Sequence, residues 1–493
     1  MSIHSLGGRP AAWPAVLVGL ALVAPAVARG QAADAGKVPI TTQSKEALTL
    51  YYEGRDLQEK LRATDAHGVL EKAVAKDSSF AMGHLLLANT APSAKEFFAS
   101  LEKAVALADK VSEGERHFIL GLEAGVKSRP HEQEEHYKKL TAAFPNDERA
   151  FNLLGGLYFG QQRYDDALAA YAKAVAINPS FSQPYNQMGY AYRFQGRYDE
   201  AEKAFKKYIE LIPRDPNPYD SYAELLMKMG RFDESIAQYE KALGVDPHFV
   251  PSYVGIGKNQ QLLGRNAQAR ATFAKLQEIG RNGGERRTAL AQSAWSWIDE
   301  GAHDKALEAV RAMYAIAEKE GDAAAMSGDA NLMGDILLDA GRHDEALAEY
   351  ARTVALMDRA QVPEDVKQAT RRNALYDEAR TALAKGDLAT ARAKSAAYAA
   401  QVAATNVRFE GWQSHYVAGL VALADKDHAR ALAELAQANP LDPQTPYALA
   451  LVHRARGDGK AARDSCTKAA QDNSLNFNYA YVRSKARKLL ASL

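Results

Sequence analysis

Two short stretches of this 493-residue chain carry residue types that metal-binding or phosphate-binding sites use. His131, Glu132 and His136 combine imidazole and carboxylate groups, but the two histidines stand five positions apart. Zinc-protease histidines occupy positions i and i+4 on one helix face, whereas a spacing of five turns the side chains apart. These residues therefore predict a helix start, with acidic side chains near its positive end, rather than a zinc site.

The second stretch, Gly-Asp-Gly-Lys at residues 457–460, resembles part of a phosphate-binding loop. Arg454 stands where an earlier glycine would be needed, and Ala461 replaces the hydroxyl residue that would hold magnesium. The sequence contains no Gly-x-Ser-x-Gly motif and no paired-cysteine zinc site. We therefore predict a protein that is not an enzyme and that uses no cofactor and no metal.

The most regular residues of the chain predict structure rather than chemistry. Four prolines stand 34 positions apart, and two short helical patterns lie between each proline and the next: Pro145, Pro179, Pro213 and Pro247. Each helical pattern has a single apolar stripe, which it can bury only by packing on neighbouring helices. The fixed period predicts an all-α fold, an α-solenoid (superhelix) of stacked antiparallel helix pairs.

Small and aromatic residues recur at fixed places in each cycle. In residues 148–181, Gly155 and Ala167 lack bulk where two helices would cross, and Tyr158 and Tyr171 would fill wider gaps beside the crossing. The pattern aromatic-x2-Leu-Gly-x2-Tyr, then Ala-x3-aromatic, then Pro is carried here by Phe151, Leu154, Gly155, Tyr158, Ala167, Tyr171 and Pro179. It resembles the tetratricopeptide repeat (TPR) family, most strongly over residues 114–281. The resemblance implies a superhelix whose concave groove is lined by the first helices and binds peptides or partner proteins.

The first 33 residues are predicted to be a secretory signal peptide. Arg9 is the only charged residue before an apolar run over residues 11–28, and small residues offer cleavage sites near Ala28 or Ala32. We therefore expect an exported protein, periplasmic or secreted, with no transmembrane segment in the mature chain. An uncleaved membrane anchor is the alternative, although Pro25 interrupts the run.

The only cysteine, Cys466, cannot form a disulfide within the chain. It stands where the repeat places a core aromatic residue of the second helix, so we predict a buried packing residue. An exported protein without disulfides must be stable through packing alone.

The rest of the chain divides into a lead, two arrays and a final helix. The predicted segments are a flexible lead (34–45), an N-terminal TPR array (46–283, most regular over 114–281), a more divergent C-terminal array (284–475) and a capping helix (476–493). Wider glycine spacing after residue 283 indicates longer helices or longer loops. Basic residues of the last helix predict a polar, solvent-facing cap: Arg483, Lys485, Arg487 and Lys488. Lysine plus arginine equals aspartate plus glutamate, 61 each, so the charge favours no nucleic-acid partner.

The resemblance also implies which first-helix residues would line the groove. These are Asn152, Phe159, Asn186, Tyr190, Arg193, Asp220, Glu224, Lys258 and Gln261. Asn152, Asn186 and Asp220 recur once per repeat, and we expect them to face solvent and to hydrogen-bond an extended peptide. The family's clamp for a carboxylate needs Lys and Asn on successive first helices. The corresponding positions here hold Asn152 and Gly156, then Asn186 and Tyr190, then Asp220 and Glu224, so the clamp is absent. Asp220 and Glu224 would also repel a carboxylate.

These features predict an exported scaffold or adaptor that binds a protein or peptide partner. Two alternatives remain open at this point. One is a small-ligand or enzyme-like site in the divergent C-terminal half, and the other is a structural spacer.

Overall fold

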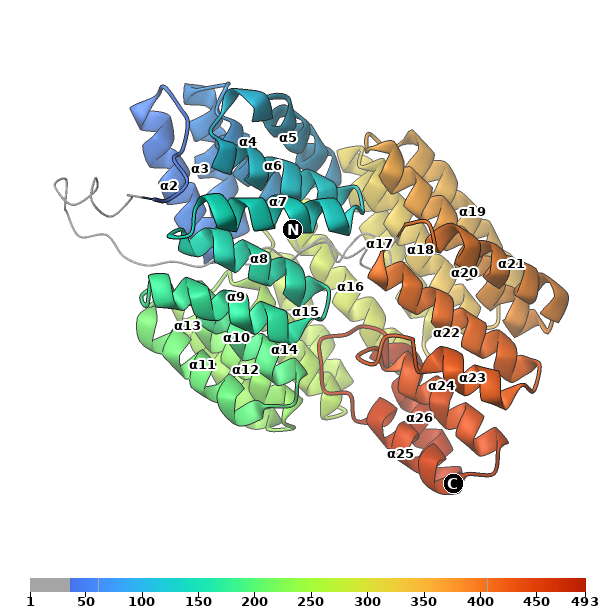
Figure 1. The fold of residues 1–493 in the computed structure, drawn as a ribbon. Coiled ribbons are helices and arrows are strands. Elements are labelled where there is room, and N and C mark those ends of the chain that lie inside the picture. The colour runs from blue at the N-terminus through green and yellow to red at the C-terminus, as the bar shows by residue number, and fades with distance from the viewer. Residues whose placement is uncertain (1–35, 61, 406) are drawn as a thin grey trace. The chain divides into compact units, whose positions relative to one another are not determined.

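The computed structural model describes residues 36–60, 62–405 and 407–493, and within these ranges the chain forms α-helices and no strand. The prediction of an all-α solenoid of antiparallel helix pairs is confirmed (Figure 1). The predicted signal peptide, residues 1–33, lies outside the described residues. Across the described part of the chain, every helix is too short or too polar to cross a lipid bilayer.

The helices form two compact units, residues 36–256 (unit 1) and residues 257–493 (unit 2), and α14 (Val250–Leu262) crosses the division. The sequence pattern placed a boundary later, at residues 282–284, but Asn282 instead caps the start of a helix in unit 2 by accepting a hydrogen bond from the Glu285 backbone N–H.

Unit 1 contains α2 (Lys45–Glu59), α3 (Ala63–Lys76), α4 (Ala81–Asn89), α5 (Ala94–Ala106), the 3-10 turn η2 (Ala108–Lys110), α6 (Glu113–Val126), α7 (Pro130–Ala143), α8 (Glu148–Gly160), α9 (Tyr164–Ile177), α10 (Ser182–Phe194), α11 (Tyr198–Leu211), α12 (Asn217–Lys228) and α13 (Phe232–Val245). Unit 2 continues with α15 (Asn266–Ile279), α16 (Gly283–Asp299), α17 (His303–Glu320), α18 (Ala323–Asp339), α19 (His343–Arg359), α20 (Glu364–Lys385), α21 (Leu388–Val402), α22 (Arg408–Ala424), α23 (His428–Leu435), α24 (Gln444–Ala455), α25 (Gly459–Ala470) and α26 (Tyr479–Ser492).

A glycine in the first helix of many pairs lies against a large side chain that follows it by 16 positions. A Cβ atom added to Gly155 would stand 2.5 Å from the Tyr171 ring, and one added to Gly189 would stand 2.6 Å from the Phe205 ring. The same spacing joins Gly54 with Leu70, Gly121 with Tyr137, Gly257 with Phe273, Gly334 with Tyr350, and Gly419 with Leu435. The role predicted for the small residues is confirmed, but Tyr171 packs directly on Gly155 rather than in a gap beside it.

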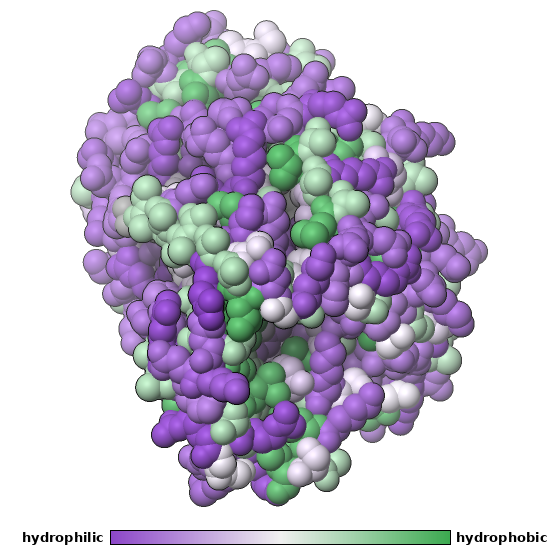
Figure 2. Space-filling model, turned by 90° about the vertical axis from the view of Figure 1, so that its right-hand side faces the viewer, coloured by the Kyte–Doolittle hydropathy of each residue, from purple (hydrophilic) through white to green (hydrophobic). Residues whose placement is uncertain are grey.

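Longer helices account for the wider spacing in unit 2. Helices α17 to α19 have 17 or 18 residues and α20 has 22, whereas α8 to α11 have 13 or 14. The 16-position contacts of Gly334 and Gly419 remain, so the added turns extend the helices without moving the crossing. The face drawn in Figure 2 is mostly polar, and apolar residues form limited strips on it.

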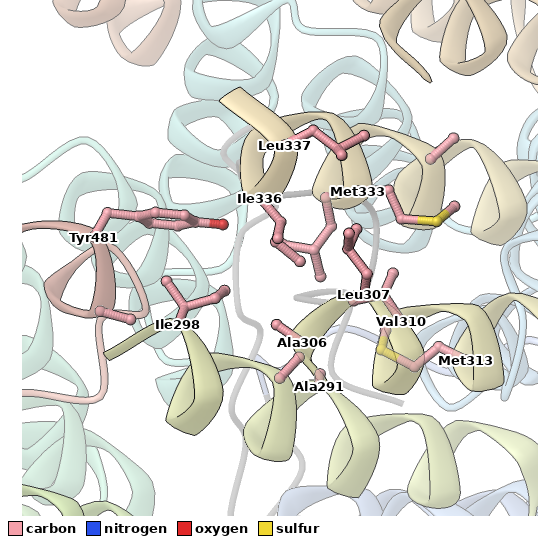
Figure 3. Packing of buried hydrophobic residues seen from close by; sticks show 14 of the residues in the cluster. Ala291, Ile298, Ala306, Leu307, Val310, Met313, Met333, Ile336, Leu337 and Tyr481 are labelled. Atoms are coloured by element: carbon pink, nitrogen blue, oxygen red, sulfur yellow. The ribbon is translucent and has the colours of Figure 1, made fainter. Parts of the chain in front are cut away.

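The last helix, α26, packs into the core of unit 2. Tyr481 lies beside Ile298 of α16 and points toward Ile336 of α18 (Figure 3), within a buried cluster that α16 to α19 share. The Arg483 side chain is 4% exposed and donates a hydrogen bond to the Leu262 carbonyl at 2.9 Å. The prediction of a solvent-facing polar cap is therefore wrong for Arg483, because α26 lies against the beginning of unit 2.

Cys466 confirms the packing prediction made for it. It is fully buried in a cluster with Ala450, Ala469, Ala486 and Leu489. It follows Ala450 by 16 positions, the same spacing as in the glycine pairs.

Candidate functional site

The residues before α2 contact the C-terminal end of α3 and the N-terminal ends of α6 and α8. In this segment, residues 37–44 (the N-terminal strap), the Val38 backbone N–H donates to Asp147 Oδ2 at 2.9 Å and the Thr41 backbone N–H donates to Glu115 Oε1 at 2.7 Å. Thr42 Oγ1 donates to Asp77 Oδ2 at 2.6 Å. The prediction of a flexible lead is therefore wrong for these residues, because polar groups at the ends of α3, α6 and α8 hold them.

A cavity of about 570 Å³ opens in unit 1 between the strap and the first helices α2, α4, α6 and α8. We name it the unit 1 pocket. Most of its lining side chains are aliphatic or aromatic: Val38, Pro39, Ile40, Tyr51, Tyr52, Met82, Leu85, Leu86, Phe118, Leu122, Tyr137, Leu153, Leu157 and Tyr171. Gly156 of α8 also lines it, and a Cβ atom built there would meet no atom within 4 Å. The α8 backbone is therefore open to anything that enters the pocket.

Charged side chains gather at one end of the unit 1 pocket. Arg149 Nε donates to Glu59 Oε1 at 3.4 Å, and Arg149 Nη1 donates to Glu148 Oε1 at 2.9 Å. Arg55 Nε lies 3.8 Å from Glu59 Oε1, and Lys37 Nζ donates to Glu148 Oε1 at 3.0 Å. Burial raises the pKa of Glu59 above its ordinary value, although Arg149 and Arg55 oppose the shift. Burial acts in the same direction on Glu148, but Arg149 and Lys37 outweigh it and lower the Glu148 pKa.

Four buried polar atoms of residues lining the pocket have no hydrogen-bond partner within the described residues. They are Arg55 Nε, Glu59 Oε2, Asn152 Oδ1 and Tyr171 Oη. Arg55 Nε lies 3.8 Å from Glu59 Oε1, and Glu59, Asn152 and Tyr171 are 1%, 6% and 0% exposed. A buried polar group without a partner costs about 1–3 kcal/mol. The pocket thus combines apolar walls with hydrogen-bonding capacity that the surrounding chain leaves unused.

The amide and carboxylate ladder does not face solvent as the sequence pattern suggested. Asn152, Asn186 and Asp220 are only 6%, 1% and 3% exposed. Asn152 Nδ2 donates to Gln183 Oε1 at 2.7 Å, and Ser252 Oγ donates to Asp220 Oδ1 at 2.7 Å. Successive first helices lie side by side, so these residues link α8 to α10 and α12 to α14. The expected solvent exposure is wrong, and only Asn152 of the three lines the unit 1 pocket.

Three other predicted groove residues form a cluster of their own. Tyr190 Oη donates to Glu224 Oε1 at 2.9 Å, and Arg193 Nη1 donates to Glu224 Oε2 at 2.9 Å. Both bonds join α10 to α12. The Phe159 ring of α8 packs against Phe194 of α10, with 5.7 Å between the ring centroids.

Lys258 and Gln261 belong to unit 2 and contact the last helix rather than an open groove. Lys258 is 3% exposed, and its Nζ lies 2.9 Å from the centre of the Tyr479 ring. Burial lowers the Lys258 pKa well below its ordinary value. Tyr479 Oη donates to Gln261 Oε1 at 2.8 Å. Both predicted groove residues therefore contact α26 within unit 2.

The pocket residues Tyr51, Arg55, Glu59 and Arg149 were missed in the sequence. The first three lie in a degenerate repeat that has no proline to fix its register. Gly156 could have pointed to the site, because it occupies a position of the family's carboxylate clamp. A glycine at that position leaves the first helix without a side chain there.

Comparison with known proteins identifies the repeat but no close relative. Residues 146–214 and 217–249 match family models described as tetratricopeptide repeat. A tetratricopeptide repeat protein from Parabacteroides merdae is 16% identical, covers 58% of this chain and 99% of its own, and has a TM-score of 0.36. No curated protein matches the sequence.

Two further solved structures are similar over shorter stretches. MamA is 25% identical over 32% of this chain and 91% of its own, with a TM-score of 0.28. PilW, described as a type IV pilus biogenesis factor, is 18% identical over 41% of this chain and 92% of its own, with a TM-score of 0.34.

Proposed function

This chain is a tetratricopeptide repeat protein, and we propose that it is an exported scaffold that binds a protein or peptide partner through the unit 1 pocket. The observation that carries the proposal is the set of four buried polar atoms without a hydrogen-bond partner in the described part of unit 1, on Arg55, Glu59, Asn152 and Tyr171. A partner segment that enters the pocket can satisfy them while it covers the apolar walls, and both changes favour binding.

The geometry supports a binding site rather than a catalytic one. Arg149 and Arg55 already engage Glu59 within 4 Å, so the only carboxylate with a raised pKa among the lining residues is tied into an ion-pair cluster. Within the described residues, no three His, Cys, Asp or Glu side chains come together in a way that could hold a metal ion. The role proposed for the pocket therefore depends on shape and hydrogen bonding.

A substitution at Gly156 tests the proposed site. Gly156→Leu would add an apolar side chain at a residue that lines the pocket, and its Cβ atom would meet no atom within 4 Å. Gly244 of α13 is the matched control, since it is also helical, has the same empty surroundings and does not line the pocket. We expect a partner captured from envelope extract by the wild-type chain to be kept by Gly244→Leu and lost by Gly156→Leu. Equal capture by both variants would refute the proposed site.

Export is part of the same proposal and has its own measurement. The apolar run at residues 11–28, followed by small residues, supports cleavage near Ala28 or Ala32. Mass spectrometry of the protein expressed in a bacterium with an envelope should find a mature chain that begins directly after one of these residues. A membrane-bound chain that still begins at Met1 would support the anchor alternative.

A further inference from the structure

The size and walls of the unit 1 pocket narrow the class of side chain that it can accept. Its volume of about 570 Å³ falls within the range of about 300–1,000 Å³ that ligand pockets usually have. Two neighbouring aromatic residues, Tyr51 and Tyr52, and the leucines of α4, α6 and α8 give it large apolar surfaces. Such walls favour a flat, apolar side chain rather than a small or strongly hydrated one.

The polar end of the pocket narrows the choice further. Glu59 Oε2 is buried and unpartnered within the described part of unit 1, and an ionised carboxylate oxygen only accepts hydrogen bonds. The Asn152 amide can turn over to offer either its oxygen or its nitrogen, and the Tyr171 hydroxyl can donate or accept. Arg55 Nε can only donate, and it already faces Glu59 Oε1 at 3.8 Å. Glu59 Oε2 is therefore the lining atom that requires a donor from the ligand. A ligand that fills the pocket must therefore bring a donor.

Charge balance argues that this donor is neutral. Three cationic lining groups, on Lys37, Arg55 and Arg149, stand against two lining carboxylates, on Glu59 and Asp147. A third carboxylate, Glu148, does not line the pocket but pairs with Lys37 and Arg149. A cation close to Glu59 would also lie close to Arg55 and Arg149, and an anion close to the arginines would meet the carboxylates. Neither sign is in excess, so a charged group would lose its water without gaining a net opposite charge.

We propose that the unit 1 pocket anchors an aromatic side chain with a neutral hydrogen-bond donor, a tryptophan or a tyrosine, presented by the peptide partner. This inference rests on the proposed function and specifies the chemistry of its ligand. The ring packs between Tyr51 and the leucines, and the indole N–H or phenol O–H donates to Glu59. Phenylalanine would fill the same space and leave the carboxylate unpartnered, so it should be rejected.

Three neutral probes with identical backbones test this chemistry on the full chain. N-acetyl-tryptophanamide, N-acetyl-tyrosinamide and N-acetyl-phenylalaninamide share their backbone amides, and the first two add a side-chain donor. In ligand-observed NMR titrations we expect the tryptophan and tyrosine amides to bind at least about tenfold more tightly than the phenylalanine amide. Two charged analogues, tryptamine and indole-3-acetate, should both bind more weakly than the neutral tryptophan amide.

The glycine variants show where the probes bind. Gly156→Leu should abolish binding of the tryptophan amide, and Gly244→Leu should leave it unchanged. Equal binding of the phenylalanine and tryptophan amides, or tighter binding of a charged analogue, would overturn the inference about the ligand's side chain. The proposed function would stand in that case if partner capture still depends on Gly156. If Gly156→Leu changes neither probe binding nor partner capture, the proposed function fails as well.

Discussion

Single glycines set how closely the two helices of a repeat approach. Gly189→Ala would place a methyl group 2.6 Å from the buried Phe205 ring, and overpacking of this kind costs about 1–3 kcal/mol. Gly68→Ala in α3 is the control, because nothing lies within 4 Å of its Cβ position and an alanine there should stabilise the helix by about 0.5–1 kcal/mol. Urea unfolding of both variants measures the difference. Similar stabilities would contradict the proposed glycine–aromatic contact.

A second residue, Asp215, should make the stability of unit 1 depend on pH. Burial raises its pKa from the ordinary 3.8 to about 6, although it accepts a hydrogen bond from the Asn217 backbone N–H. Between these values the folded chain binds more protons than the unfolded chain, so stability falls as pH rises from 4 to 6 and is constant above. A shift of about two pKa units corresponds to about 3 kcal/mol.

Asp215→Asn should remove this contribution while keeping an acceptor for the Asn217 N–H. Hydrogen exchange of α11 and α12 at several pH values would show the difference between variant and wild type growing from pH 4 to 6. A constant difference over that range would mean that Asp215 is not the titrating group.

Residue spacing in the sequence predicted which positions recur but not all of their surroundings. The periodic apolar residues, such as Tyr171 and Phe205, are buried as expected because their helix stripe can only face the partner helix. Asn152 and Asn186 recur just as regularly, yet they lie between neighbouring first helices. A helical period fixes the direction of a side chain around its own helix. It does not show how near the next repeat stands, and that distance decides their burial.

Between elements, buried polar links hold one helix pair on the next. In unit 2, Arg287 of α16 donates to both carboxylate oxygens of Asp329 in α18, at 2.5 and 2.9 Å, and to the Met313 carbonyl at 2.7 Å. Both charged side chains are 1% exposed. Asp329→Ala would leave the arginine buried without its counter-ion and should cost about 3–5 kcal/mol.

The double variant Arg287→Met with Asp329→Leu removes the whole ion pair. It therefore tests whether the single variant is unstable because an arginine is buried without a counter-ion or because the ion pair itself is missing. Because it removes both charges, it should recover most of the stability in urea unfolding. A double variant as unstable as Asp329→Ala would show that the ion pair itself is required.

Among the helices, the sequence predicted the helix pairs well, but it did not predict the unit 1 pocket. The 34-residue period and the glycine pairs specify each crossing locally, even where unit 2 lengthens its helices. The pocket depends on α2 and α4, whose repeats lack the proline, and on the strap, which has no periodic pattern. Contacts such as that between Arg149 and Glu59 join residues 90 positions apart, and no local pattern predicts them.

In the whole molecule, a change that destabilises one unit should leave the stability of the other unit unchanged. Removing residues 477–493 would expose the core residues that α26 covers, including Ile298 and Ile336 (Figure 3). Hydrogen exchange should then accelerate in α16 and α18 and stay unchanged in α6 to α11, because repeats couple mainly to their neighbours. Lys485→Gln, which removes only a partly exposed ion pair with Asp339, should cost less than about 1 kcal/mol. Loss of protection throughout both units would contradict independent behaviour.

The strap and the last helix also govern the order in which the chain assembles. Glycine–aromatic contacts join residues 16 positions apart, whereas Val38 reaches Asp147 across 109 positions and Arg483 reaches Leu262 across 221. The entropy lost on closing a loop grows with its length, and folding slows as contacts become less local. Helix pairs therefore form early, and both ends close late on a stack that already exists. Until the strap closes, the unit 1 pocket lacks the wall that Val38 and Ile40 provide, so the proposed binding site would be complete only in the final stage of folding.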